Sequence, residues 1–179
     1  WEKLGATVTN MAAGEIFQAL QSGTLDAAEF VGPYNDLALG FHQVAKNYYM
    51  PSFVESGLAT ELVVDKKKYQ ELPEDLQAII RDVSQAEYDQ VAADFYANDP
   101  RALKTLVEEH GVTVRNFPDD IMEAGAKASV EVVEELRSSD DPLVKKTADS
   151  FVEALNLVRT RTEKIDSPYI QARQSFLKY

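Results

Sequence analysis

The sequence predicts an α/β fold whose C-terminal half is mostly helical. In residues 1–65, short β-prone runs alternate with a helical segment, a pattern typical of a βαβ unit with parallel strands. From Pro73 onward, apolar residues recur mostly at helical spacing. The chain has 179 residues, of which 45% are hydrophobic and 27% are charged. This size and composition suit one domain with a buried core.

Three elements are expected at the start of the chain. Residues 7–11 and 25–31 have the composition of short strands, and residues 14–22 have that of a helix with one apolar face. Gly23 follows the helix and is well placed as a left-handed C-cap. Gly32-Pro33 is expected to end the second strand. The strand, helix and strand together would form the βαβ unit.

Two further extended segments are expected before the helical half. Residues 48–57 are aromatic. Pro51 marks them as an edge or bent segment, because proline cannot donate a hydrogen bond within a sheet. Residues 58–65 are predicted as a strand. Asp65 can then N-cap a short helix that begins at Lys66.

Most of the second half is expected to be helical. Pro73, followed by Glu74 and Asp75, suits the start of a helix. The run from Asn98 to Pro100 is expected to stop this helix and to start another. The helix after Pro100 is expected to end at Gly111, and a strand is expected over residues 112–117. A further helix is expected after Pro118, with a break at 138–142. An amphipathic helix over 142–164 and a short helix from Asp166 would complete the chain.

Charge and composition exclude several classes of function. The net charge of −12 argues against a nucleic-acid-binding surface, which needs a basic stripe, and against electrostatic docking on anionic lipid. The chain has no cysteine, which excludes disulfides, thiolate catalysis and zinc-thiolate sites. No apolar run reaches the roughly 18 residues of a membrane-spanning helix.

The common catalytic and phosphate-binding motifs are absent from the sequence. There is no GxGxxG, P-loop, HExxH or GxSxG pattern. His42 and His110 are far apart in the sequence, and we interpret both as structural residues. The aromatic side chains of Tyr48, Tyr49 and Phe53 are interpreted as packing residues rather than as the lining of a ligand pocket.

Two acids stand out because each lies near the end of a predicted extended segment. Glu29 comes near the end of the run over residues 25–31, among residues expected to be dry, and Glu55 follows the aromatic segment. In open α/β sheets, ligands bind beyond the carboxyl ends of the strands. The two carboxylates could hold a cation, act as a general acid and base as in glycosidases, or lie on the surface at loop entries. Their positions alone leave these three alternatives open.

The string GEIFQALQSGTLDAAEFVGPYNDLALGFHQVAKNYYMPSFVESG closely resembles the solute receptors (DctP-like) of tripartite ATP-independent periplasmic (TRAP) transporters. The likeness is strongest to the branch that binds 2-oxoacids, and it continues through LVVDKKKYQELPEDLQAII and the helical half. In this family two acids hold a metal ion that bridges to the ligand carboxylate. By position they are Glu29 and Glu55, and the backbone carbonyl of Phe30 is the third ligand. The metal is sodium in some members and calcium in others.

The resemblance also implies the architecture. The family has a two-lobe fold of the type II periplasmic-binding-protein kind, and residues 1–179 would be the C-terminal portion of such a receptor. They would supply most of one lobe plus the C-terminal helices. Residues 1–65 would form the α/β lobe and crossing strands, and residues 66–179 would be mostly helical with one strand near 112–117. The family's carboxylate-binding arginine would precede Trp1. Phe30 stands where the family usually has tryptophan, which bears on the fit of the ligand and not on the carbonyl.

The resemblance implies a binding protein and not an enzyme. It would work in the periplasm, capture a small monocarboxylate (a 2-oxoacid such as pyruvate, or a hydroxy acid) and deliver it to the TRAP membrane subunits. Exchange of a C-terminal helix within residues 142–164 would allow a homodimer. One alternative is a hydrolytic enzyme that uses Glu29 and Glu55 as an acid/base pair. A second alternative is a helical interaction protein, in which both acids could be replaced freely.

Overall fold

The computed structural model describes residues 1–54 and 61–177. The chain divides into two compact units, Trp1–Met122 and Glu123–Tyr179, and each is described by itself.

The first unit begins with short helices joined by irregular segments. Their bounds are η1 (Glu2–Leu4), α1 (Ala13–Ser22), α2 (Pro33–Ala38) and η2 (Phe41–Gln43). Helix α1 agrees with the prediction and ends at Gly23, whose φ of 73° lies in the left-handed region. Pro33 occupies the first turn of α2, where its missing N–H leaves no bond unmade.

The sheet of this unit is smaller than the sequence predicts. Strand β1 (Asn47–Tyr49) pairs in parallel with β2 (Thr113–Arg115), and Tyr48 lies opposite Val114. Strand β2 confirms the strand expected over residues 112–117, and β1 lies at the start of the aromatic segment. The two-stranded parallel pair is the β component of the α/β fold among the described residues.

Three of the predicted strands are wrong or fall partly outside the described residues. Residues 7–11 and 25–31 are irregular, as are residues 61–65, whereas residues 58–60 lie outside the described part of the chain. The βαβ unit expected at the start of the chain is therefore absent from the described residues. A short apolar run does not specify a strand unless a second strand lies beside it to complete the hydrogen bonds.

Helix α3 (Lys66–Glu71) is linked to the long helix α4 (Glu74–Glu108) by a tight turn. The side chain of Asp65 accepts a hydrogen bond from the backbone N–H of Lys68 at 2.9 Å, which confirms its capping role. The hydroxyl of Tyr69 donates to the carbonyl of Gln77 at 2.9 Å. Pro73 is the N-cap of α4 and not its first helical residue.

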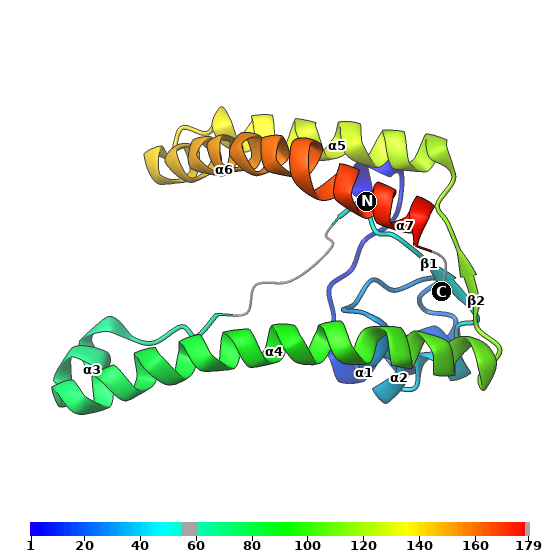
Figure 1. Ribbon diagram of the computed structural model, residues 1–179, viewed down its shortest axis with the longest axis horizontal. Coiled ribbons are helices and arrows are strands. Elements are labelled where there is room, and N and C mark those ends of the chain that lie inside the picture. Colours follow the sequence, from blue (N-terminus) through cyan, green and yellow to red (C-terminus); the bar gives the residue numbers. More distant parts are fainter. Residues whose placement is uncertain (55–60, 178–179) are drawn as a thin grey trace. The chain divides into compact units, whose positions relative to one another are not determined.

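Helix α4 continues through Pro100, so the predicted stop at residues 98–100 is wrong. A proline inside a helix costs about 3 kcal/mol, because it removes one backbone hydrogen bond and its ring crowds the preceding turn. The helix persists because tertiary packing outweighs this local cost. Helix α2 packs beside α4 (Figure 1), and Ala102 and Leu106 are buried in the turns that follow Pro100.

The core of the first unit is formed by side chains of α1, η2, the C-terminal part of α4 and the residue before β2. Its buried apolar side chains among the described residues are Ile16, Phe41, Ala102, Leu106 and Val112. Gly111, with φ of 65°, reverses the chain between α4 and β2. The N–H of Val112 then donates to the carbonyl of Leu106 at 2.9 Å. This core supports the region that precedes and contains α2.

The second unit is a helical hairpin with a C-terminal extension. Helix α5 (Asp119–Arg137) begins at the end of the first unit, and α6 (Pro142–Arg161) runs antiparallel beside it (Figure 1). Arg137 forms an ion pair with Asp149 at 2.8 Å across the hairpin. The predicted break at residues 138–142 is confirmed. Helix α7 (Ser167–Phe176) follows α6 through the π-helical turn η3 (Thr162–Asp166).

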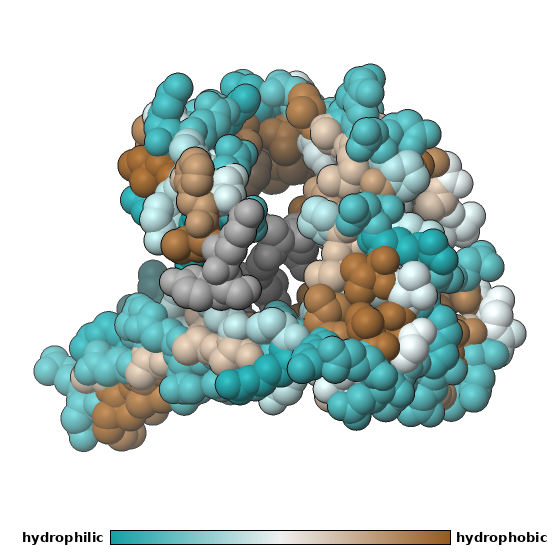
Figure 2. Space-filling model, turned by 45° about the vertical axis from the view of Figure 1, so that its right-hand side comes forward, coloured by the Kyte–Doolittle hydropathy of each residue, from teal (hydrophilic) through white to brown (hydrophobic). Residues whose placement is uncertain are grey.

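Apolar side chains reach the surface of the protein in several places among charged ones (Figure 2). Those of α6 include Leu143, Phe151, Leu155 and Leu157, each at least half exposed. Within the described residues, no helix combines the length and the apolar character needed to cross a membrane.

Candidate functional site

The segment that carries Glu29 and Phe30 lies directly before α2. Glu29 is exposed and Phe30 is half-buried. The ring of Phe30 packs edge-on against that of Phe41, with centroids 5.6 Å apart and planes at 83°. The core therefore anchors the Phe30 side chain, while the Glu29 carboxylate is accessible to solvent. The sequence suggested an acid among dry residues, and the structure instead places Glu29 at the surface.

Glu55, the second acid expected to hold a metal, lies outside the described residues. Among the described residues, no group of three or more His, Cys, Asp or Glu side chains could hold a metal ion. Of the three predicted ligands, the structure describes the Glu29 carboxylate and the Phe30 carbonyl.

The residues before Glu55 belong to an aromatic cluster. The ring of Phe53 lies 4.6 Å from Trp1 and 5.9 Å from Phe117, and Tyr49 lies 5.1 Å from Phe117. Tyr49 and Phe53 thus contact other rings, as their interpretation as packing residues requires. The chain has one tryptophan, so Trp1 can report on this cluster by fluorescence.

A buried acid that the sequence interpretation missed lies seven residues after Glu29. Asp36 in α2 is 8% exposed, and its Oδ2 accepts a hydrogen bond from the hydroxyl of Tyr48 at 2.6 Å. Burial raises the pKa of Asp36, and the negative charge of Asp99 acts in the same direction. The Tyr48 hydroxyl and the backbone amides of Val31 and Gly32 lower this pKa in part. Burial and the hydrogen bond to Asp36 in turn raise the pKa of Tyr48.

Asp99 of α4 caps the start of α2. Its Oδ1 accepts a hydrogen bond from the backbone N–H of Tyr34 at 3.0 Å, which satisfies a donor in the first turn of α2. The ring of Tyr34 packs edge-on against Phe95 of the same long helix, with centroids 6.2 Å apart. The Asp-Pro pair expected to break a helix therefore supplies a cap to another helix. In the sequence, the signal for this contact was the helix start at Gly32-Pro33, where the N-cap residue has no side chain to bind the free N–H groups.

The two histidines come together although they are far apart in the sequence. The rings of His42 and His110 stack with centroids 4.0 Å apart and planes at 24°. Burial lowers the pKa of His42, and the positive charges of His110 and Lys46 act in the same direction. Lys46 donates to the carbonyl of His110 at 2.9 Å, so this contact joins the end of α4 to the segment before β1.

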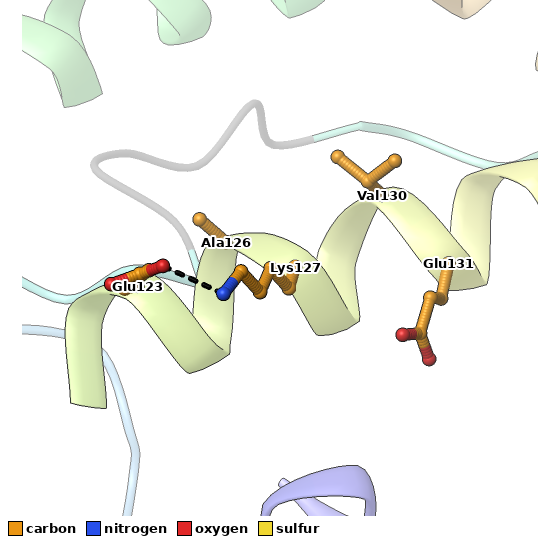
Figure 3. Close-up of a pocket in the computed structure, with 5 residues that line it drawn as sticks. All are labelled: Glu123, Ala126, Lys127, Val130 and Glu131. Atoms are coloured by element: carbon orange, nitrogen blue, oxygen red, sulfur yellow. Dashed lines mark ion pairs between the residues drawn. The ribbon is translucent and has the colours of Figure 1, made fainter. Parts of the chain in front are cut away.

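Two hollows of the second unit are surface features of the helical hairpin. One is lined by residues of α5 alone: Glu123, Ala126, Lys127, Val130 and Glu131. Figure 3 shows these side chains along one helix, with Glu123 and Lys127 joined by an ion pair of 2.6 Å. The other hollow is an apolar groove between α5 and α6 that includes Leu136, Ala148 and Phe151. Neither hollow contains a set of polar groups that converge on one point.

The family comparison identifies similarity over most of the chain. Residues 1–140 match the model of the bacterial extracellular solute-binding proteins, family 7 (DctP). A monocarboxylate 2-oxoacid-binding periplasmic protein of Nostoc sp. (strain PCC 7120) is 33% identical over 138 residues, which cover 77% of this chain and 38% of that protein.

Two solved structures share the fold of this chain. A TRAP transporter solute-binding protein from Bordetella bronchiseptica RB50, a dimer with calcium and picolinate in its occupied site, is 29% identical with a TM-score of 0.80. A TRAP periplasmic solute-binding protein from Pseudoalteromonas atlantica T6c, with bound sodium and pyruvate, is 32% identical with a TM-score of 0.79. The matches cover 98% and 95% of this chain, but 53% and 51% of the solved chains.

The chain therefore spans about half the length of these solved proteins and 38% of the curated relative. The likeness to solute-binding proteins agrees with the two-lobe receptor fold that the sequence resemblance implied, of which this chain is a part. These matches give no support to the hydrolase interpretation of Glu29 and Glu55.

Proposed function

Because this chain belongs to the family 7 bacterial extracellular solute-binding proteins, we propose that it helps to capture a small monocarboxylate in the periplasm. The ligand class is a 2-oxoacid such as pyruvate, or a hydroxy acid, bound together with a sodium or calcium ion. The ligand would then be delivered to the membrane subunits of a TRAP transporter. The names of the 2-oxoacid-binding relative and of the pyruvate-bound structure support this proposal.

The observation that carries the proposal is the arrangement at Glu29 and Phe30. An exposed carboxylate adjoins a residue whose ring is anchored on Phe41, so a carboxylate and a backbone carbonyl belong to adjacent residues of a supported segment. Hard cations such as calcium bind these two kinds of oxygen, and the donor chemistry therefore fits the ion. Glu29, the Phe30 carbonyl and Glu55 would hold the cation, which would supply positive charge to the ligand carboxylate.

A bound cation also explains how an acidic protein can take an anionic ligand. The chain carries a net charge of −12, and its summed field disfavours the approach of a carboxylate. A cation held beside Glu29 would reverse the sign of the potential locally. The same acid that repels the ligand would then bind it through the ion.

The test compares cation binding in matched variants. Thermal unfolding of the wild type should shift upward with calcium or sodium, because the ion binds only the folded state. The gain is about 2.7 kcal/mol at a hundredfold excess over the dissociation constant. Glu29→Gln and Glu55→Gln should abolish the shift, whereas Phe30→Trp should keep it because the carbonyl remains. Glu87→Gln, at an exposed acid of α4, is the control and should behave as the wild type.

Calorimetry with pyruvate in the presence of each ion completes the test. Saturable binding without turnover would agree with a receptor, and conversion of the ligand would favour an enzyme. If Glu29→Gln bound the cation as tightly as the wild type, the proposed ligand set would be wrong.

We also propose that the chain forms a homodimer through its C-terminal helices. The support is the row of exposed apolar side chains on α6, including Phe151 and Leu155, and the dimeric state of the Bordetella structure. Exchange of identical helices reuses contacts that already exist within one chain. Light scattering should show a dimer, and Leu155→Glu should yield monomer. A wild type that stays monomeric at high concentration would contradict the proposal.

A further inference from the structure

Helix α2 has no capping side chain of its own, because its N-cap residue is Gly32. The helix has six residues, and a helix this short is marginal unless contacts with other parts of the fold stabilise it. The first N–H groups of any helix have no partner within the helix. Pro33 has no N–H, so Tyr34 carries the first backbone donor of α2. This donor needs an acceptor from elsewhere in the chain.

Asp99 of the long helix α4 supplies this acceptor. Its Oδ1 accepts a hydrogen bond from the N–H of Tyr34 at 3.0 Å, and the two residues are 65 positions apart. The carboxyl group also lies against Gly32, because a Cβ added to that glycine would be 3.4 Å from Oδ1 and 3.7 Å from Oδ2. A negative charge beside the start of a helix is favourable. Asp99 therefore takes, from α4, the role that an N-cap side chain has within its own helix.

A ring contact beside this cap joins the same two helices. Tyr34 packs edge-on against Phe95, with ring centroids 6.2 Å apart and planes at 84°. Phe95 and Asp99 are four residues apart in α4 and so lie on the same face of that helix. Helix α2 packs along this part of α4 (Figure 1). The start of α2 is thus attached to α4 by a hydrogen bond and by a pair of rings.

The position of α2 in turn limits where the carbonyl of Phe30 can lie. Val31 alone separates Phe30 from Gly32. The carbonyl of Gly32 accepts from the N–H of Asp36 at 2.9 Å, so the backbone is part of the hydrogen-bonded helix from Gly32 onward. At the other end, the ring of Phe30 packs on Phe41. The backbone of residues 30–32 therefore has a fixed contact at each end.

We propose that Asp99 is a positioning residue, which holds the start of α2 against α4 and thereby directs the carbonyl of Phe30 toward the cation. This inference rests on the proposed function, because that function makes the Phe30 carbonyl a ligand. Asp99 acts through Tyr34 and does not touch the ion. If the start of α2 were loose, the segment would have to become ordered when the ion binds, and this cost would lower the affinity.

Two substitutions of Asp99 separate its hydrogen bond from its charge. Asp99→Ala removes both, whereas Asp99→Asn removes the charge and keeps an oxygen that can accept from the N–H of Tyr34. Asp94→Ala is the matched control, because Asp94 is an acid of the same helix that accepts from Gln90 within α4 at 3.1 Å. All three changes remove one negative charge. A general electrostatic effect on calcium binding would therefore appear in all three variants.

Hydrogen–deuterium exchange of the amides in residues 31–34 is the main readout. Asp99→Ala should accelerate exchange at Tyr34 by about tenfold, the factor expected for losing a hydrogen bond to a charged group. Asp99→Asn should accelerate it less, because a neutral acceptor still binds the N–H, and Asp94→Ala should leave it unchanged. Adding Gly32→Ser to Asp99→Ala should slow the exchange again. A serine at the N-cap can accept from first-turn amides, and the space beside position 32 is free once the Asp99 carboxyl group is gone.

Exchange in the sheet separates a local release of α2 from unfolding of the first unit. The N–H of Thr113 in β2 donates to the carbonyl of Lys46 at 2.8 Å. Its exchange should keep the wild-type rate in every variant, because opening of one short element is local. If Asp99→Ala accelerated exchange equally at Thr113 and at Tyr34, Asp99 would stabilise the whole unit, and the positioning role would be wrong.

Calcium titration of the same proteins is the second readout. Asp99→Ala should bind calcium about threefold to tenfold more weakly than the wild type, because part of the binding free energy must then order the segment. The affinity of Asp99→Asn should lie closer to that of Asp94→Ala than to that of Asp99→Ala. Equal calcium affinity in Asp99→Ala and Asp99→Asn would overturn the proposal, as would unchanged exchange at Tyr34 in Asp99→Ala. A wild type with no response to calcium would instead refute the proposed function, and exchange in residues 31–34 would still decide whether Asp99 holds the start of α2.

Discussion

Replacing Leu106 by alanine should test how much the small core stabilises the first unit, which carries Glu29 and Phe30. Leu106 is 1% exposed and lies in α4 after Pro100. Leu→Ala at a buried position costs about 2–5 kcal/mol, because apolar burial is lost and a cavity remains. We expect about 3 kcal/mol here, since few other buried side chains surround the position and can relax into the space. Such a loss is a large fraction of the roughly 5–15 kcal/mol that stabilises a typical domain.

Urea unfolding followed by the fluorescence of Trp1 measures this cost. Trp1 packs on Phe53 within the first unit, so its signal reports on that unit. Val107→Ala is the control, because Val107 is the next residue of α4 and is 42% exposed, and it should cost less than about 1 kcal/mol. Leu106→Met, which nearly conserves volume, should cost less than about 1.5 kcal/mol. Equal costs for Leu106→Ala and Val107→Ala would refute the reasoning.

Three further predictions concern helix ends and the histidine pair. Gly23→Ala should destabilise the chain by about 1 kcal/mol in urea unfolding, because a φ of 73° is strained for any residue with a Cβ; no loss would contradict this. Asp141→Ala should cost about 1 kcal/mol, because Asp141 accepts from the N–H of Leu143 at 2.8 Å as the N-cap of α6, whereas Asp141→Asn should keep most of the stability. Because the fold lowers the pKa of His42 below its usual 6.5, the stability that this shift contributes is present above pH 6.5 and is lost as the pH falls through the lower folded value. Urea midpoints at pH 7.5 and pH 5 should therefore differ more in the wild type than in His42→Phe, which keeps a ring to stack on His110.

The sequence predicted helix boundaries well where a nearby side chain or glycine sets them. The end of α1 at Gly23 and the start of α3 after Asp65 follow from interactions within a few residues. The strands predicted over residues 7–11 and 25–31 were wrong, because a strand depends on a partner that lies elsewhere in the chain. The stop predicted at Pro100 was wrong for a similar reason, since burial of Leu106 and the packing of α2 are tertiary effects.

The candidate site was predicted in part by the family resemblance and in part missed. Glu29, Phe30 and Glu55 stay predictions as metal ligands; the structure places Glu29 and Phe30 on one segment, and Glu55 lies outside the described residues. The buried acid proved to be Asp36, which the sequence interpretation did not single out. Its burial depends on contacts with Tyr48 and Asp99, and these residues lie 12 and more positions away. No local pattern reveals such contacts.

The different exposure of Glu29 and Asp36 fits the different contacts that each carboxylate makes. A carboxylate that binds an incoming ion must be reachable from solvent and must lose water only when the ion replaces it, and Glu29 is exposed as this requires. A carboxylate that joins two elements must be shielded, because water would compete for its hydrogen bond, and Asp36, which accepts from the Tyr48 hydroxyl of β1 at 2.6 Å, is buried. Burial of Asp36 costs free energy, and this cost is why the pKa of Asp36 is raised. An accessible ligand beside Phe30, whose ring is anchored on Phe41, can bind an ion without the backbone having to become ordered first, which reduces the free-energy cost of binding.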